Sequence, residues 1–126
     1  MSSWTEDELR RIGDVEELKV ASYRRDGSLR PYVTIWVVRA GDDVIERSAH
    51  GPDNGWFRRA KASGRGRIRA GGVERDIAFT DAAPDAHAKI DAAYHAKYDR
   101  YGPRIVNTVV GDHVTDTTFR LVPAGG

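Results

Sequence analysis

The feature that most constrains the fold is one apolar run, YVTIWVVR at residues 32–39. β-branched and aromatic residues, which are enriched in strands, fall at both odd and even positions of this run. Successive side chains of a strand point to opposite faces, so both faces of this strand are apolar. Such a pattern is typical of a strand that is covered on both sides. We therefore expect residues 32–39 to be a central strand of a sheet closed into a barrel, starting at Pro31, where proline is tolerated.

Turn residues divide the rest of the chain into short strands. Asp26 and Gly27 supply the positive φ of a hairpin turn, and glycines open later turns at residues 41–43 and 71–72. The other strands are expected at residues 18–23, 44–48, 65–70, 73–80 and 114–122. About six strands, mostly linked as hairpins, indicate a small antiparallel barrel with helices packed outside.

Three helices are expected. Thr5 and Glu8 have the spacing of a capping box, which predicts a short helix that stops at Gly13. Asn54 has the side chain of an N-cap and predicts a helix of about two turns. A long helix is expected at residues 84–101, where a Gly-Pro pair stops it.

Composition limits the class of protein. A chain of 126 residues suits a single domain, 1–126. Its formal net charge of +1 gives no global field for nucleic acid or a membrane, so neither is expected as a partner. The absence of cysteine excludes disulfides, iron–sulfur clusters and thiolate zinc sites, and fits the expected cytoplasmic location. No run approaches the roughly 18 apolar residues of a membrane span, and the acidic N-terminal segment predicts no signal peptide.

Two blocks, GSLRPYVTIWVVR and AYHAKYDRYG, resemble those of the bacterial domain-of-unknown-function family 2255, and the likeness covers nearly the whole chain. Residues 18–80 also resemble the split β-barrel of the flavin-binding superfamily, which includes pyridoxamine-phosphate oxidases and deazaflavin-dependent nitroreductases. The resemblance implies an α+β fold that is mainly β: a small antiparallel split β-barrel with an N-terminal helix, a short helix after the third strand and a long helix before the last strand. It also implies a homodimer that holds flavin mononucleotide or a deazaflavin coenzyme in a cleft between its subunits.

The same resemblance gives a role to the loop SAHGPDNGWF. In deazaflavin-type members a Ser-x-Gly-Gly loop precedes a Pro-x-Trp-Tyr helix and lies against the cofactor phosphate. In this chain the positions at or beside those of the two motifs are occupied by Ser48, His50, Gly51 and Trp56. Glycine permits close approach of the backbone, and the amides at a helix N-terminus favour an anion. Arg59 could add a bidentate contact. The implied phosphate ligands are Ser48, His50, Gly51 and Arg59.

Two departures from these patterns favour an alternative. Pyridoxamine-phosphate oxidases place a phosphate-binding lysine about where Trp56 stands, and Pro52 replaces the second glycine of the deazaflavin loop. Proline has no backbone N–H, so the loop loses one donor. The alternative is a cofactor-free barrel that binds a small molecule in the same cleft, without redox chemistry.

Residues of the long apolar run are candidates for the ring site. Thr34 and Trp36 point to one face of the strand, and the resemblance implies that they line the ring together with Trp56. The other interpretation of Trp36 is that it fills the barrel core. Arg30 either pairs with Asp26 across the turn or meets a phosphate.

Three further patterns have structural explanations beside functional ones. The basic stretch at residues 58–75 could meet nucleic acid, but we expect a solvated or anion-facing surface. Helical spacing links His87, Asp91 and His95, which could form a metal face but are expected to be an exposed polar stripe. A tyrosine ridge on the same helix is expected in the core or a dimer interface, with a proton donor as the alternative. The ridge consists of Tyr94, Tyr98 and Tyr101.

No nucleophile stands beside a base at recognisable spacing, so hydrolase chemistry has no support. In an enzyme of this kind, a bound cofactor would carry out the difficult chemical step, and the protein would position it. The sequence thus predicts a homodimeric flavin- or deazaflavin-binding oxidoreductase, a small reductase or oxidase. A cofactor-free small-molecule-binding barrel is the alternative.

Overall fold

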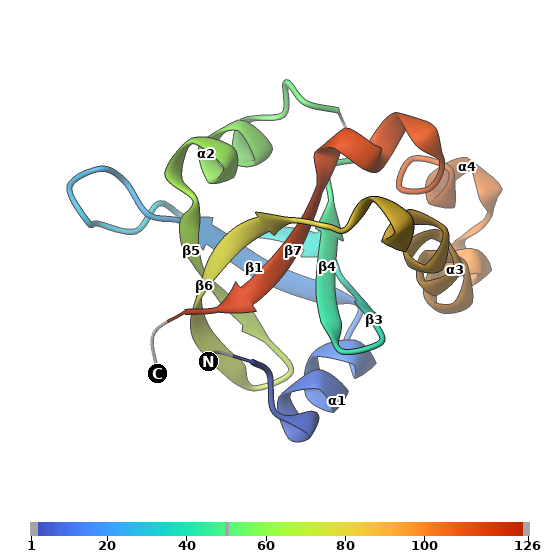
Figure 1. Ribbon diagram of the computed structural model, residues 1–126, viewed down its shortest axis with the longest axis horizontal. Helices are drawn as coiled ribbons and strands as arrows, with labels where there is room; N and C mark the ends of the chain where they lie inside the picture. Colours follow the sequence, from blue (N-terminus) through green and yellow to red (C-terminus); the bar gives the residue numbers. More distant parts are fainter. Residues whose placement is uncertain (1–2, 50, 125–126) are drawn as a thin grey trace.

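The computed structural model describes residues 3–49 and 51–124, so His50 lies outside the described residues. Within them, seven strands form one antiparallel sheet in the order β2-β1-β5-β6-β7-β4-β3. The strands are β1 (Glu17–Ser22), β2 (Val33–Trp36), β3 (Val38–Ala40), β4 (Asp43–Arg47), β5 (Arg65–Ala70), β6 (Val73–Asp81) and β7 (Thr118–Pro123). Figure 1 shows the sheet curled round on itself.

The apolar run at residues 32–39 is not one central strand, and that prediction is wrong. The run bends at Val37 into β2 and β3, which occupy the two ends of the sheet order. β2 pairs with β1, and β3 pairs with β4. One bent segment therefore carries the chain from one end of the sheet to the other, and the barrel is nearly closed. The run is apolar on both faces because Val33 packs on the barrel interior while Val38 packs on a second cluster outside it.

Helices surround the barrel. They are α1 (Glu6–Asp14), α2 (Gly55–Ser63), α3 (His87–Tyr98) and α4 (Pro103–Val106), with 3₁₀ segments η1 (Pro84–Ala86), η2 (Asp99–Tyr101) and η3 (Asp112–Thr117). In Figure 1, α1 and α2 lie at opposite ends of the barrel, and α3 and α4 lie together on one side. No helix within residues 3–49 and 51–124 has the length and apolar character needed to cross a bilayer.

The local signals for helix starts are confirmed. Thr5 and Glu8 form the complete capping box of α1, and the Asn54 side chain accepts a hydrogen bond from Trp56 N at the start of α2. The predicted long helix is instead the succession η1, α3 and η2. The predicted last strand loses residues 114–117 to η3, so β7 begins at Thr118.

Two apolar clusters stabilise the fold. The first fills the barrel, where the rings of Phe57 and Phe119 stack with centroids 4.8 Å apart. The second lies between the barrel and α3 and contains the fully buried Tyr94 and Tyr98. Of the predicted tyrosine ridge, only Tyr101 is exposed, at 43 %. The core interpretation is therefore correct for two of the three tyrosines.

Candidate functional site

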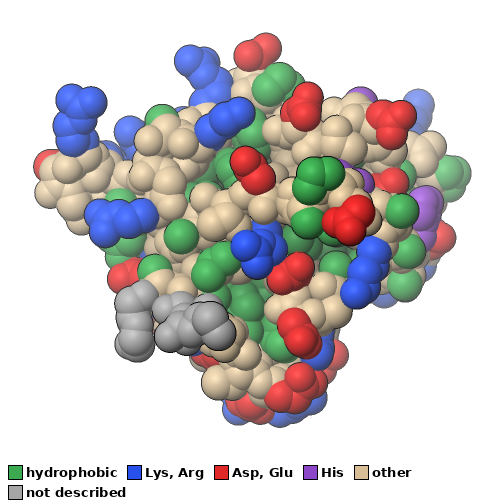
Figure 2. Space-filling model, in the orientation of Figure 1, with side chains coloured by type: hydrophobic (Ala, Val, Ile, Leu, Met, Phe, Trp, Pro, Cys, Tyr) green, Lys and Arg blue, Asp and Glu red, His purple; other side chains and the backbone are tan. Residues whose placement is uncertain are grey.

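A basic groove lies between the β1–β2 loop and α2, with a volume of about 960 Å³. Its cationic lining residues are Arg24, Arg25, Arg30, Arg58, Arg59, Lys61 and Arg65. No carboxylate of the described residues lies within 4.0 Å of these seven side chains. Figure 2 shows Lys and Arg side chains standing out on this side of the molecule, at the upper left. The groove is thus a concentration of positive charge without close ion pairs, although Asp26 and Asp76 lie near enough to interact with Arg24 and Arg65.

Neighbouring groups order several of these cations without neutralising them. The guanidinium carbon of Arg65 lies 5.6 Å from the ring centroid of Tyr23, and Lys61 Nζ lies 5.9 Å from that of Phe57. Cation–π contacts of this kind attract the charge but do not cancel it. Arg24 donates a hydrogen bond to the carbonyl of Leu29 at 3.2 Å. The groove therefore presents its charge from partly ordered side chains.

A second hollow, the apolar pocket, lies between β2, α4 and the chain after β4, with a volume of about 570 Å³. Its apolar lining consists of Val33, Ile35, Trp36, Ala49, Trp56, Ile105 and Val109, and its polar lining of Thr34, Arg47, Asn54, Arg104 and Thr108. The ring of Trp36 stacks on Tyr98, with centroids 4.0 Å apart and planes 7° apart. One wall of the pocket is therefore an aromatic pair anchored on α3.

A third, small hollow of about 10 Å³ has a lining that overlaps those of both larger hollows. It shares Val33 and Trp56 with the apolar pocket, and Arg30 and Arg59 with the basic groove. Trp56 and Arg59 are three residues apart on α2 and are neighbours on the helix surface. A single turn of α2 thus presents an apolar ring to one hollow and a cation to the other.

The loop before α2 is held by its own hydrogen bonds. Ser48 is 0 % exposed, and its Oγ donates to Gly51 O at 2.7 Å, so this hydroxyl positions the loop instead of facing the groove. Gly51, at φ +82°, donates its N–H to Ser48 O, and Asn54 N donates to Gly51 O. The Trp56 amide is taken by the Asn54 side chain. The loop therefore offers fewer free amides to a ligand than the family resemblance implies.

The structure divides the other predicted site residues between the hollows. Arg30 and Arg59 line the basic groove, whereas Thr34, Trp36 and Trp56 line the apolar pocket. Asp26 does not pair with Arg30, because its carboxylate accepts from the N–H and the hydroxyl of Ser28. Trp36 is half-buried and packs on the cluster under α3, so it does not fill the barrel interior. Thr34 is exposed and accepts from Lys19 Nζ at 3.2 Å.

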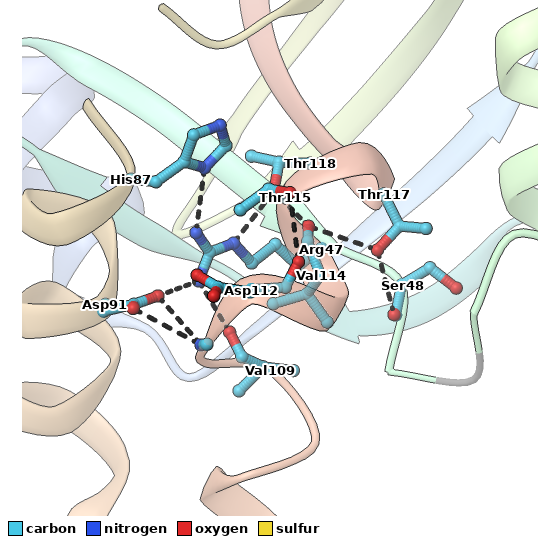
Figure 3. Close-up of polar contacts among 11 residues, drawn as sticks. Arg47, Ser48, His87, Asp91, Val109, Asp112, Val114, Thr115, Thr117 and Thr118 are labelled. Carbon is cyan, nitrogen blue, oxygen red and sulfur yellow. Dashed lines mark hydrogen bonds and ion pairs between the residues drawn. The ribbon is translucent and has the colours of Figure 1, made fainter. Parts of the chain in front are cut away.

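A buried arginine beside the apolar pocket was not among the predicted site residues. The Arg47 side chain is 0 % exposed. Its Nη1 donates to Asp91 Oδ1 at 2.5 Å and to Val109 O at 2.8 Å, and its Nε donates to Thr118 Oγ1 at 2.9 Å (Figure 3). Its Nη2 lies 3.2 Å from His87 Nδ1. One guanidinium therefore ties β4 to α3, to β7 and to the chain after α4.

These contacts correct the interpretation of His87, Asp91 and His95 as one exposed polar stripe. The first two hold Arg47, whereas His95 pairs at the surface with Asp99 at 2.7 Å. A guanidinium can only donate, so His87 Nδ1 is the acceptor in this contact. Within the described part of the chain, no group of three or more His, Cys, Asp or Glu side chains could hold a metal. The available signal was Glu46–Arg47, two adjacent charges that follow Val44 and Ile45 in the same strand.

Glu46 is the second residue that sequence analysis missed. It points to the opposite face of β4 from Arg47. Its side chain is 0 % exposed, and neither carboxylate oxygen has a hydrogen-bond partner among the described residues. Burial raises the pKa of this carboxyl to about 8, so it is mostly neutral at neutral pH. Burial also raises the pKa of Tyr94, whose hydroxyl likewise has no partner within the described residues.

Comparison with known proteins identifies one matching family. The model of a family described as "Uncharacterized protein conserved in bacteria (DUF2255)" matches residues 8–121. A search of curated proteins finds no matching sequence.

Solved structures share the fold at low sequence identity. A protein of unknown function from Agrobacterium tumefaciens str. C58, Atu2129, has a TM-score of 0.66 and 12 % identity, over 94 % of this chain and 54 % of its own. This chain thus spans about half the length of that protein. The heme storage protein HutZ from Vibrio cholerae has a TM-score of 0.60 and 14 % identity, over 95 % and 88 % of the two chains. An FAD-binding protein from Mesorhizobium loti has a TM-score of 0.56 and 15 % identity, over 98 % and 92 %.

Proposed function

The chain belongs to the bacterial family of uncharacterized proteins DUF2255, and from its split-barrel fold and paired hollows we propose that it binds a phosphorylated flavin or deazaflavin cofactor. The proposed activity is that of a small reductase or oxidase. Proteins that bind FAD or store heme share the fold, which supports a ligand in the cleft.

The observation that carries the proposal is the turn of α2 on which Trp56 lines the apolar pocket and Arg59 lines the basic groove. A phosphorylated flavin joins a flat ring, which is apolar on its faces, to an anionic tail. The apolar pocket and the basic groove have these two complementary characters, and one turn of α2 contributes to both. Their volumes, about 570 and about 960 Å³, lie in the range of roughly 300–1,000 Å³ typical of small-molecule sites.

The residues present fit such a group. Trp36 and Trp56 would cover the ring and exclude water, and the Thr34 hydroxyl and the Asn54 side-chain amide would meet its polar edge. Arg30 and Arg59 would hold the phosphate nearest the ring. When bound, a flavin supplies the hydride and electron transfer that side chains lack. The chain's own contribution is to bind, orient and shield.

A heme ligand has less support. Heme iron is held by His, Cys, Met or Tyr side chains. None of these residue types is among the described lining residues of the apolar pocket. The cofactor-free alternative is favoured by a different observation, the loop before α2. Its amides at Gly51 and Asn54 are used internally, and Pro52 has none, so the backbone cradle is reduced.

We also propose that the protein is a homodimer. Tyr101 and Ile105 are the large apolar side chains of the described residues that remain exposed, at 43 % and 47 %. Ile105 lines the apolar pocket, and Tyr101 lies against Trp36, with ring centroids 5.6 Å apart. A second subunit placed on these residues would cover the open side of the pocket.

Ligand titration tests the cofactor. The protein is titrated with flavin mononucleotide, riboflavin and a deazaflavin coenzyme, and quenching of ligand fluorescence gives each Kd. We expect Arg59→Ala to weaken the binding of flavin mononucleotide by about tenfold or more, because one charge-assisted hydrogen bond is lost. The Kd of riboflavin should change less than about twofold. Lys89→Ala, which removes an exposed cation from α3, is the matched control and should leave every Kd unchanged.

The outcomes separate the two accounts. Binding of none of the three ligands by the parent protein would favour the cofactor-free alternative. If Arg59→Ala weakened the binding of riboflavin and flavin mononucleotide equally, the proposal that the groove binds the phosphate would be wrong.

A further inference from the structure

The basic groove carries more positive charge than one phosphate group can use. We propose that it selects a ligand with a diphosphate over a ligand with a single phosphate. This inference rests on the proposed function, because the groove is the phosphate end of that site.

The first argument is charge. Nine arginines elsewhere in the described chain have a carboxylate within 4.0 Å; they are Arg10, Arg11, Arg39, Arg47, Arg67, Arg69, Arg75, Arg100 and Arg120. The seven cations of the groove have none. Their mutual repulsion is a cost that a bound anion offsets. A phosphate monoester carries about −1.5 to −2 at neutral pH, which a pair of arginines already balances.

The second argument is position. Arg30 and Arg59 line both the groove and the small hollow that shares Val33 and Trp56 with the apolar pocket, so of the seven cations they lie nearest that pocket. The other five line the groove alone, and we call them the outer cations: Arg24, Arg25, Arg58, Lys61 and Arg65. A phosphate bound by Arg30 and Arg59 leaves the outer cations without an anion. A second phosphate, one linkage further from the ring, extends toward them.

The third argument is space. The groove, at about 960 Å³, is larger than the apolar pocket of about 570 Å³ assigned to the ring. A single phosphate fills a small part of it. A diphosphate with a further group attached uses both the volume and the outer charge.

Two ligand pairs, each differing in the number of phosphates, test the inference. The Kd values of flavin mononucleotide and FAD are measured by fluorescence, and those of AMP and ADP by calorimetry. We expect ADP to bind about tenfold tighter than AMP, since one more charge-assisted contact is worth about that factor, and FAD to bind tighter than flavin mononucleotide. Arg25→Gln should weaken the binding of ADP and FAD by about tenfold and change the Kd of AMP and of flavin mononucleotide less than about twofold.

Two further variants complete the set. Arg59→Gln should weaken all four ligands, because it lies at the first phosphate. Lys89→Gln removes one charge outside the groove and should weaken none, which controls for net charge.

Each outcome decides one proposal or both. Equal affinities within the two pairs, or no selective effect of Arg25→Gln, overturn the diphosphate inference while flavin binding stands. A preference for ADP in a protein that binds no flavin supports the diphosphate groove and overturns the flavin proposal. Absence of binding by all four ligands overturns both.

Discussion

At the scale of single residues, the buried Glu46 makes the stability of the protein depend on pH in a predictable direction. Burial raises the pKa of its carboxyl from 4.5 to about 8. Between these values the unfolded chain has released a proton that the folded protein keeps. The free energy of unfolding therefore falls as the pH rises through this window, by up to about 1.4 kcal/mol per pH unit. We expect Glu46→Gln to remove this decrease in the free energy of unfolding, which is measured by urea unfolding at several pH values.

The quantity to follow is the stability of the Glu46→Gln variant minus that of the parent. This difference should grow from about pH 5 to about pH 8 and then level off, because the carboxyl is then ionised in both states. Glu17→Gln, at an exposed glutamate of β1, is the matched control and should show no such growth. A constant difference for Glu46→Gln would mean that this carboxyl does not titrate as a buried group.

At the scale of elements, Arg47 joins β4 to α3 through Asp91. Removing one partner of a buried ion pair leaves an uncompensated charge and costs roughly 3–5 kcal/mol. The Asp91 side chain is 31 % exposed, so Asp91→Ala is expected to lower the free energy of unfolding by about 3 kcal/mol, at the low end of that range. His95→Ala removes an exposed pair on the same helix and should cost less than about 1 kcal/mol. Equal effects in urea unfolding would mean that α3 is not held through Arg47.

At the scale of the whole molecule, the proposed dimer makes a prediction about mass. Sedimentation at micromolar concentration should give about twice the chain mass of 14.0 kDa. Ile105→Glu places a charge on an exposed apolar side chain and should shift the protein toward the monomer, because a buried unpaired charge is costly. Asn107→Glu adds the same charge at an exposed polar neighbour and serves as the control. A parent protein that sediments as a monomer would contradict the shared cleft.

The sequence by itself determined the elements whose signals act over a few residues. The Thr5 capping box, the Asn54 cap and the turn at Gly27 all appear where they were predicted. Caps and turns are made by neighbours along the chain, so their chemistry can be read without knowing the fold. Periodicity and the family resemblance also predicted the barrel class, and the predicted site residues included two cations of the basic groove, Arg30 and Arg59.

The tertiary structure decided what depends on distant partners. The bend at Val37 exists because the ends of the sheet must meet, and Tyr98 of α3 bonds to the Val37 backbone where the strand is interrupted. Burial of Glu46 and Arg47 depends on which elements cover each face of β4. The alternation of side chains along a strand does not predict which elements these are. The placing of Arg30 and Arg59 around one small hollow likewise depends on segments far apart in sequence. Such long-range contacts are set by packing of the whole chain, so local pattern could not predict them.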